Sequence, residues 1–135
     1  MKRIVPIFGR EKVTSVVRDE YERLMWGCES KGIAIKDGFL YRIGAPIPML
    51  RIPGKNEFSP REIKYIALEE LANGLEEIVR QNVTVNKNNL FQFIVQKLGF
   101  SRTGDAIYGR LDAALKLCKN VLETNGVLSY IKTNQ

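Results

Sequence analysis

A glycine-bounded turn, Gly99-Phe100-Ser101-Arg102-Thr103-Gly104, lies between two amphipathic segments and constrains this chain most strongly. The segment after it is expected to be helical to about Thr124, because its apolar residues follow helical spacing: Ile107, Leu111, Leu115, Cys118 and Leu122. Gly126 is expected to end that helix before a β-prone run over residues 127–131. Helix, tight turn, longer helix and strand is the order typical of a winged helix-turn-helix.

The segments just before this turn complete the expected motif. Asn86 and Asn88 are candidate N-caps for a helix through Leu98, and Gly99 supplies a left-handed residue after it. Residues 83–85 are β-prone and are expected to form a short strand that pairs with the wing.

Another helix is expected upstream, because residues 58–62 read Phe-Ser-Pro-Arg-Glu. Ser59 suits the N-cap, Pro60 suits the first helical position, and Glu62 completes a capping box. This helix is expected to run to about Gln81, with Asn73-Gly74 bending or interrupting it.

The N-terminal third repeats part of the pattern. A helix is expected from about Lys12 to Ser30, closed by Gly32, and Asp37-Gly38 between two β-prone runs predicts a hairpin. The apolar stripe of that helix precedes the C-terminal stripe by a constant 94 residues: Val13, Val17, Tyr21, Leu24 and Cys28. We therefore favour a degenerate structural repeat over coincidence.

The predicted fold is mainly α with small β-wings, a tandem degenerate winged helix-turn-helix. Residues 1–44 are expected to form a partial unit, 45–57 a Pro-rich connector that lies along a surface, and 58–135 the more complete unit. The first unit lacks the two helices that should precede its own helix. Either residue 1 lies inside a longer protein, which we favour, or the first unit is completed by packing on the second.

Composition excludes several classes of function. The 135 residues are 44% hydrophobic, which is enough for a packed core. Histidine is absent, which removes His-dependent triads and His metal ligands, and we predict no catalytic residue, metal site or cofactor. Cys28 and Cys118 are expected to be buried, reduced thiols. No apolar run is long enough for a membrane span and no signal peptide is recognisable, so we expect a cytoplasmic protein without a membrane partner.

The net charge of +6 is unevenly distributed. Residues 56–80 have three Lys/Arg against six Asp/Glu, whereas residues 81–135 have seven against three. The basic end suits a polyanion, although a merely soluble surface can have the same balance. Glu62, Glu69 and Glu76 recur every seven residues on the acidic helix, and we interpret them as a solvated or partner-facing stripe in preference to metal ligands or an acid/base pair.

The turn and its surroundings resemble an uncharacterised C-terminal domain of bacterial superfamily I helicase-like proteins, which often also have a very-short-patch-repair-type endonuclease domain. The resemblance rests on residues 99–104, on residues 58–63, and on Ile107, Arg110, Leu111, Ala114 and Leu115. Phe39-Leu40 ahead of Pro46 and Pro48 extends it. Two features depart from the family pattern: the region between Ile63 and Leu90 is longer, and Phe8-Gly9-Arg10-Glu11 does not preserve Arg-Thr-Gly. The resemblance implies an accessory module of a nucleic-acid-remodelling machine, without helicase or nuclease chemistry.

Seven residues are candidate contacts to DNA phosphates: Lys97, Arg102, Thr103, Gly104, Arg110, Lys116 and Lys119. The first turn of a helix presents N–H groups that attract phosphate, and Arg102 adds a charge beside them. An equally weighted alternative makes Thr103 an N-cap and pairs Arg102 with a surface acid. For the lysines on the long helix we slightly prefer a solvated face, because Asp105 and Asp112 share it.

Two functions therefore stay open. The first is a non-catalytic module of a helicase-like or restriction-type bacterial protein that contacts the DNA backbone without sequence preference. The second is a protein-interaction or dimerisation domain that packs on neighbouring domains of a larger polypeptide or on a second copy. The acidic stripe and the two aspartates favour the second.

Overall fold

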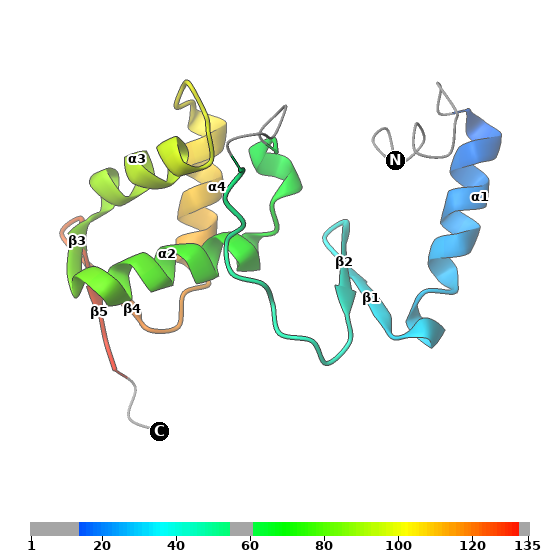
Figure 1. Ribbon diagram of the computed structural model, residues 1–135, viewed down its shortest axis with the longest axis horizontal. Coiled ribbons are helices and arrows are strands. Elements are labelled where there is room, and N and C mark those ends of the chain that lie inside the picture. Colours follow the sequence, from blue (N-terminus) through cyan, green and yellow to red (C-terminus); the bar gives the residue numbers. More distant parts are fainter. Residues whose placement is uncertain (1–13, 55–60, 133–135) are drawn as a thin grey trace. The chain divides into compact units, whose positions relative to one another are not determined.

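The computed structural model describes residues 14–54 and 61–132 (Figure 1). The chain divides into two units, residues 1–46 and 47–135, which are described separately below. Across the described ranges, four α-helices, two short 3₁₀-helices and two small antiparallel sheets form a mixed α/β structure. None of the helices in these ranges is both long and apolar enough to cross a membrane.

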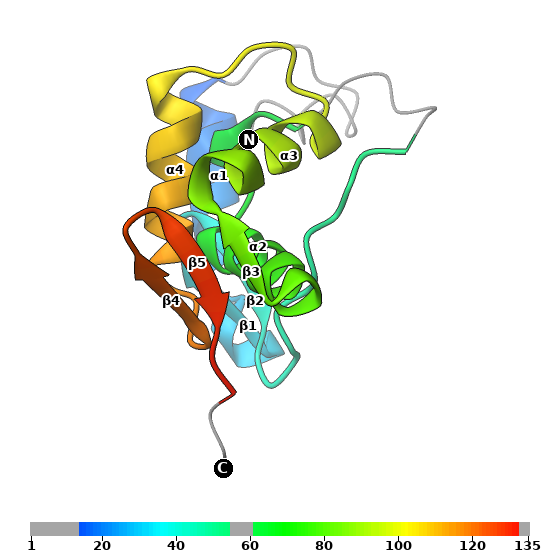
Figure 2. The same cartoon turned by 90° about the vertical axis from the view of Figure 1, so that its left-hand side faces the viewer.

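Unit 2 consists of three α-helices and a three-stranded sheet. In chain order they are α2 (Leu68–Asn82), β3 (Thr84–Asn86), α3 (Lys87–Lys97), α4 (Asp105–Leu115), β4 (Val121–Thr124) and β5 (Val127–Tyr130). The sheet order is β3-β5-β4, so β5 lies in the middle and is antiparallel to both neighbours (Figure 2). The strand predicted near residues 83–85 is confirmed, and it pairs with the hairpin.

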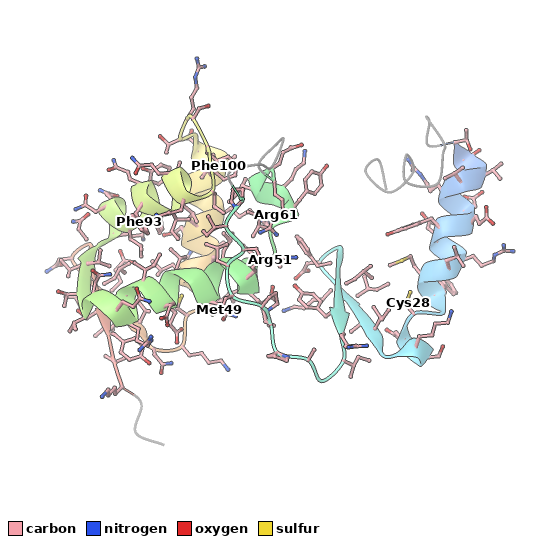
Figure 3. All side chains as sticks on the ribbon, viewed as in Figure 1. Cys28, Met49, Arg51, Arg61, Phe93 and Phe100 are labelled. Carbon is pink, nitrogen blue, oxygen red and sulfur yellow. The ribbon has the colours of Figure 1, made fainter. Side chains whose placement is uncertain are left out.

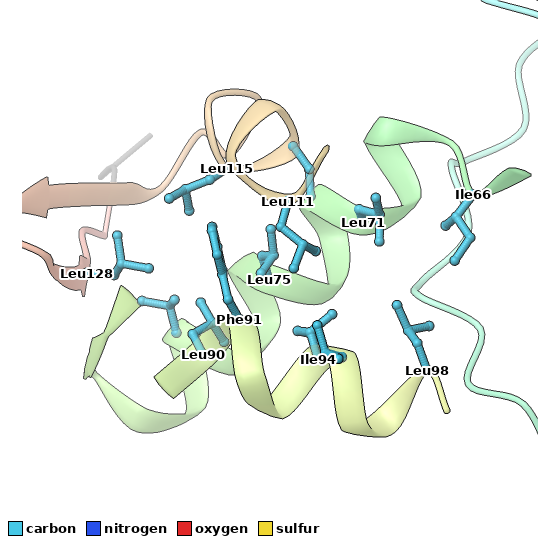
Figure 4. Close-up of a cluster of buried hydrophobic side chains, with 14 residues drawn as sticks. Ile66, Leu71, Leu75, Leu90, Phe91, Ile94, Leu98, Leu111, Leu115 and Leu128 are labelled. Atoms are coloured by element: carbon cyan, nitrogen blue, oxygen red, sulfur yellow. The ribbon is translucent and has the colours of Figure 1, made fainter. Parts of the chain in front are cut away.

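The core of unit 2 lies where the three helices meet the sheet (Figure 4). Its most deeply buried apolar residues come from the helices, from β5 and from the segment before α2: Ile66, Leu71, Leu75, Val79, Leu90, Ile94, Leu111, Ala114 and Leu128. Phe91 and Tyr108 add a tilted aromatic pair with ring centroids 5.7 Å apart. Burial of each large side chain contributes on the order of 2 kcal/mol, which makes this core the main source of stability.

Local sequence fixes both ends of α3. The Asn86 side chain accepts hydrogen bonds from the backbone N–H groups of Asn88 and Asn89, so Asn86 is the N-cap. At the other end Gly99 is left-handed, with φ of 78°, and the N–H of Phe100 donates to the carbonyl of Val95. This Schellman motif is favoured by glycine and turns Phe100 back onto the core.

The prediction that the last helix reaches Thr124 is wrong, because α4 ends at Leu115. Residues 116–120 leave the helix in turns, and Leu122 lies on β4. Gly126 does not end a helix: it shares a two-residue hairpin turn with Asn125, and both residues have positive φ, 51° and 76°. Asn-Gly strongly favours this turn because both positions need left-handed backbone. The helical spacing that continues to Leu122 is therefore coincidental.

The helix expected to start at Pro60 begins later. Ser59 and Pro60 lie outside the described residues, whereas Glu62 and Ala67 are extended and α2 starts at Leu68. Between them the chain forms only the short 3₁₀-helix η3 (Ile63–Tyr65). Ile66 then follows in an extended conformation, with its side chain buried in the core. The predicted interruption at residues 73–74 is also wrong, because α2 is continuous through them.

Residues 47–54 are irregular and lie along α2, as expected for a Pro-rich connector. The Nδ2 group of Asn73 donates to the carbonyls of Ile47 and Pro48, at 3.1 and 3.2 Å. Leu50 packs on the core beside Gly74, where an added Cβ would lie 2.5 Å from the Leu50 Cβ. Gly74 therefore permits the close approach of the connector and does not bend the helix.

Unit 1 contains α1 (Ser15–Trp26), the 3₁₀-helix η2 (Glu29–Lys31) and one hairpin, β1 (Ile33–Lys36) and β2 (Phe39–Arg42). The hairpin predicted at Asp37-Gly38 is confirmed, with both residues at positive φ. The expected helix start at residues 12–13 and the turn at residues 8–11 lie outside the described residues. Within residues 14–46, no residue is buried.

The two units share a repeat, but the predicted spacing of 94 residues is wrong. The hairpins correspond at 88 residues, with Asp37-Gly38 matching Asn125-Gly126 and the same strand register in both. The hydrogen bonds that close the hairpins match as well. Ile43 N–H donates to the Gly32 carbonyl at 2.8 Å, and Ile131 N–H donates to the Asn120 carbonyl at 2.9 Å.

The helices of the repeat correspond at 90 residues, two more than the hairpins, because unit 1 has a longer turn containing η2. Each helix is followed by a cysteine whose thiol donates to a carbonyl four residues earlier, Cys28 to Leu24 and Cys118 to Ala114. The half-buried residues of α1 and Cys28 then match the apolar residues of α4 and Cys118: Val17, Tyr21, Met25 and Cys28 against Ile107, Leu111, Leu115 and Cys118.

Candidate nucleic-acid interface

Arg102, Thr103 and Gly104 lie in the turn between α3 and α4, and all three are exposed. Gly104 is the N-cap of α4 in place of Thr103, and no side chain caps this helix start. The turn borders an open hollow of about 410 Å³, lined by Gln92, Val95, Gln96, Phe100, Ser101, Arg102 and Thr103. The described residues provide no carboxylate within ion-pair distance of Arg102, so the predicted pairing with a surface acid is not found among them.

Arg110 is not available to a phosphate. Its Nη2 donates a 2.6 Å hydrogen bond to the carbonyl of Ile66, and its Nε is buried without a hydrogen-bond partner among the described residues. The side chain therefore ties α4 to the extended segment before α2. This is a packing role, and Arg110 leaves the set of candidate contacts.

Lys116 and Lys119 lie at the other end of α4 from Arg102. The helix has 11 residues, which separates its ends by roughly 16 Å. The exposed Lys116 has its Nζ 3.4 Å from a carboxylate oxygen of Asp112. Lys119 follows the helix in a turn, where its backbone N–H donates to Glu76 at 2.9 Å. The structure thus does not bring these two lysines together with Arg102.

Lys97 does not line the hollow beside Arg102; together with Phe93 it lines a separate pocket that includes Met49 and Ile52. It ends α3, and its Nζ lies 5.2 Å from the ring centroid of Phe93, an exposed cation–π contact. Of the predicted lysines, Lys97 is the nearest to Arg102 in the sequence, five residues before it, but the two side chains border different hollows.

Asp112 and Lys87 form a charge cluster on the far half of α4. Lys87 Nζ lies 2.6 Å from Asp112 and 3.0 Å from Glu123. Its hydrogen bond lowers the pKa of the Asp112 carboxyl, and the same bond is the largest cause of the raised pKa of Lys87. The ion pair with Lys87 neutralises Asp112, one of the two aspartates expected to repel phosphate. The cluster also links the start of α3 to α4 and β4.

The acidic stripe predicted on the upstream helix does not exist as one surface. Glu62 precedes η3 and is not on α2. Glu76 accepts hydrogen bonds from the backbone N–H of Lys119 and from the Asn120 side chain, at 2.9 and 2.7 Å, and so holds the turn after α4. The three glutamates therefore do not form the single helical stripe, solvated or partner-facing, that the sequence predicts.

Sequence reasoning also missed the most buried ionic group of the described residues. Glu70 at the start of α2 is 2% exposed and accepts hydrogen bonds from both guanidinium groups labelled in Figure 3, Arg51 and Arg61. The Arg51 backbone N–H donates to the same carboxylate at 3.0 Å. The sequence offers one indication of this burial: Glu70 directly precedes Leu71, which is expected to point inward. To use it, one must know that α2 begins at Leu68.

Cys28 and Cys118 are free, half-buried thiols. Burial raises the pKa of Cys118 to about 12, and the nearby charge of Glu76 adds to this. Because the thiolate is the reactive form, we expect iodoacetamide at pH 8 to modify Cys118 at least about tenfold more slowly in the folded chain than in denaturant. Mass spectrometry of a Cys28→Ser variant isolates this reaction. Equal rates in the folded and unfolded chain would contradict the burial of this thiol.

In the part of the chain that the structure describes, no group of three or more His, Cys, Asp or Glu side chains is placed to hold a metal ion. No protein-family model, no curated protein and no solved structure matches the chain. A function for the α3–α4 turn must therefore be argued from the geometry and charge of the turn itself.

Proposed function

We propose that unit 2 is a winged helix-turn-helix that binds DNA phosphates through the start of α4, as a non-catalytic accessory module of a helicase-like or restriction-type bacterial protein. The element order α2-β3-α3-α4-β4-β5 supports this, with α3 and α4 as the helix-turn-helix pair and β4–β5 as the wing. The position of β5 between β3 and β4 supports it further, because the wing is then joined to the helices through β3.

The observation that carries the proposal is the uncapped, exposed N-terminus of α4 with Arg102 beside it. Free backbone N–H groups and the positive end of a helix dipole attract phosphate, and a guanidinium adds charge-assisted hydrogen bonds. Thr103 and Lys97 flank the same turn. Asp105 in the first turn opposes phosphate, which fits weak binding without sequence preference.

Replacing Arg102 with Ala is expected to weaken binding of a random DNA duplex by about tenfold and to reduce the slope of log affinity against log salt by about 1. Fluorescence anisotropy at about 50 and 200 mM salt measures both, and binding of the unmodified chain is expected on the order of 10 μM at the lower salt. Arg80→Ala is the matched control. It removes the same charge from an exposed arginine that already bonds Glu77 at 2.6 Å.

The DNA proposal fails if the unmodified chain does not bind at 50 mM salt, or if Arg80→Ala weakens binding as much as Arg102→Ala. The second outcome would mean that net charge alone drives association.

A second function, docking of a protein partner, is favoured by a separate observation in unit 1. Large apolar side chains there are exposed, among them Leu24 and Leu40. Exposed apolar surface of this kind is typical of interaction sites.

A further inference from the structure

Two of the exposed apolar residues of unit 1, Leu24 and Leu40, occupy positions that are buried in unit 2. Leu40 on β2 is 51% exposed, whereas its counterpart on β5, Leu128, is fully buried. Leu24 on α1 is 66% exposed, whereas its counterpart on α4, Ala114, is fully buried. The correspondence follows from the matched hairpin register and the matched cysteine hydrogen bonds. Unit 1 therefore has residues that match the inward face of unit 2, and its described residues 14–46 contain no segment equivalent to α2, β3 and α3.

Unit 2 shows what covers this face. Leu111, Ala114 and Leu128 belong to one core with residues of α2 and α3: Leu71, Leu75, Leu90, Phe91 and Ile94. The strand between these two helices, β3, completes the cover by pairing with β5 on the edge opposite β4. The cover is thus one continuous helix–strand–helix segment.

The hairpin of unit 1 has the matching open edge. In unit 2 the Tyr130 N–H on β5 donates to the carbonyl of Val83 at 2.9 Å, just before β3. The residue at the same position of β2 is Arg42. Among the described residues, β2 pairs only with β1.

We propose that the face formed by α1 and β2, with Tyr21, Leu24, Met25 and Leu40 at its centre, is a docking surface for a partner polypeptide that supplies a helix–strand–helix segment. The partner strand pairs antiparallel with β2, and its two helices cover the apolar residues of α1. A second copy of this chain is the less suitable occupant, because its own α2–β3–α3 segment is already packed on α4 and β5. This proposal is independent of DNA binding by unit 2.

The test uses the full chain and a fluorescent peptide of residues 66–98 from the same sequence, because this segment covers the matching face in unit 2. We expect saturable binding that is at least about tenfold weaker, equivalent to 1.4 kcal/mol, in the separate variants Leu24→Asp and Leu40→Asp. Val16→Asp is the matched control and is expected to bind within about twofold of the unmodified chain. Val16 is also exposed, at 70%, but it corresponds to Ala106, which is exposed in unit 2 as well.

Hydrogen exchange gives a second readout that a non-specific apolar contact does not produce. Arg42 N–H is expected to exchange at least about tenfold more slowly when the peptide is bound, since it gains a strand partner. Absence of peptide binding, equal binding by all three variants, or unchanged exchange at Arg42 overturns the proposal. Self-association of the chain that is lost in Leu24→Asp and Leu40→Asp also overturns it, because a second copy is then the occupant.

Discussion

Replacing Glu70 with Gln is expected to lower the free energy of unfolding of unit 2 by about 3 kcal/mol at pH 7. The carboxylate is buried and accepts hydrogen bonds from the guanidinium groups of Arg51 and Arg61, the shortest of them 2.7 Å for each arginine. An amide of the same size has no charge and can accept at one atom only. The variant therefore leaves guanidinium N–H groups without an acceptor and loosens the connector from the start of α2.

The effect of this substitution is expected to depend on pH. Burial alone raises the pKa of Glu70, but the hydrogen bonds from Arg51 and Arg61 outweigh it and lower the pKa from 4.5 to about 2. A carboxyl with a lowered pKa stabilises the folded state fully above its unfolded pKa, and this stabilisation is lost as the pH falls toward the folded pKa. The stability difference between the unmodified chain and Glu70→Gln should therefore shrink between about pH 4.5 and pH 2.

Urea unfolding followed by circular dichroism at pH 7, 4 and 2.5 measures this difference. Glu77→Gln is the control, because Glu77 also has a pKa lowered to about 2, by hydrogen bonds from Arg80 and Gln81, but lies on the helix surface. Surface ion pairs contribute little, so its effect is expected to be much smaller than that of Glu70→Gln. A stability difference that does not change with pH would show that Glu70 acts through packing and not through its charge.

Three sequence signals that are confined to a few neighbouring residues predicted the structure correctly. Asp37-Gly38 gave the first hairpin, Asn86 gave the start of α3, and Gly99 gave its end. Each acts through its own backbone conformation or a hydrogen bond within three residues, so no knowledge of the fold is required. The exposed turn at Arg102 was placed correctly because it lies directly after Gly99.

Features that depend on distant residues were not predictable from these signals. Arg110 was expected to face DNA, but its partner is the carbonyl of Ile66, 44 residues earlier in the chain. The burial of Glu70 depends on Arg51, 19 residues away, and on where α2 begins. Leu122 continued a helical spacing by chance, and only the pairing of β4 with β5 shows that it belongs to a strand. Periodicity identifies apolar faces but does not identify their partners.

Replacing Gly74 with Ala is expected to destabilise unit 2 by about 1–2 kcal/mol, although alanine is the better helix former by about 1 kcal/mol. The added methyl group would lie 2.5 Å from the Cβ of Leu50 and 2.7 Å from its Cδ2. A Cβ is fixed to the backbone, so relief requires the connector to move away from α2. Thermal unfolding gives the change in stability, and faster hydrogen exchange at residues 47–52 would show the displaced connector.

Two further variants separate the steric effect from helix propensity. Gly109→Ala in α4 is the matched control, because nothing lies within 4 Å of its added Cβ, and it is expected to stabilise the chain by up to about 1 kcal/mol. In a Leu50→Gly background the obstructing Cβ is gone, so Gly74→Ala should change sign and become stabilising. The resulting coupling energy, on the order of 2 kcal/mol, measures the contact between the connector and α2 directly. If Gly74→Ala stabilises the unmodified chain as Gly109→Ala does, the connector does not press on the helix at Gly74, and the role assigned to this glycine is wrong.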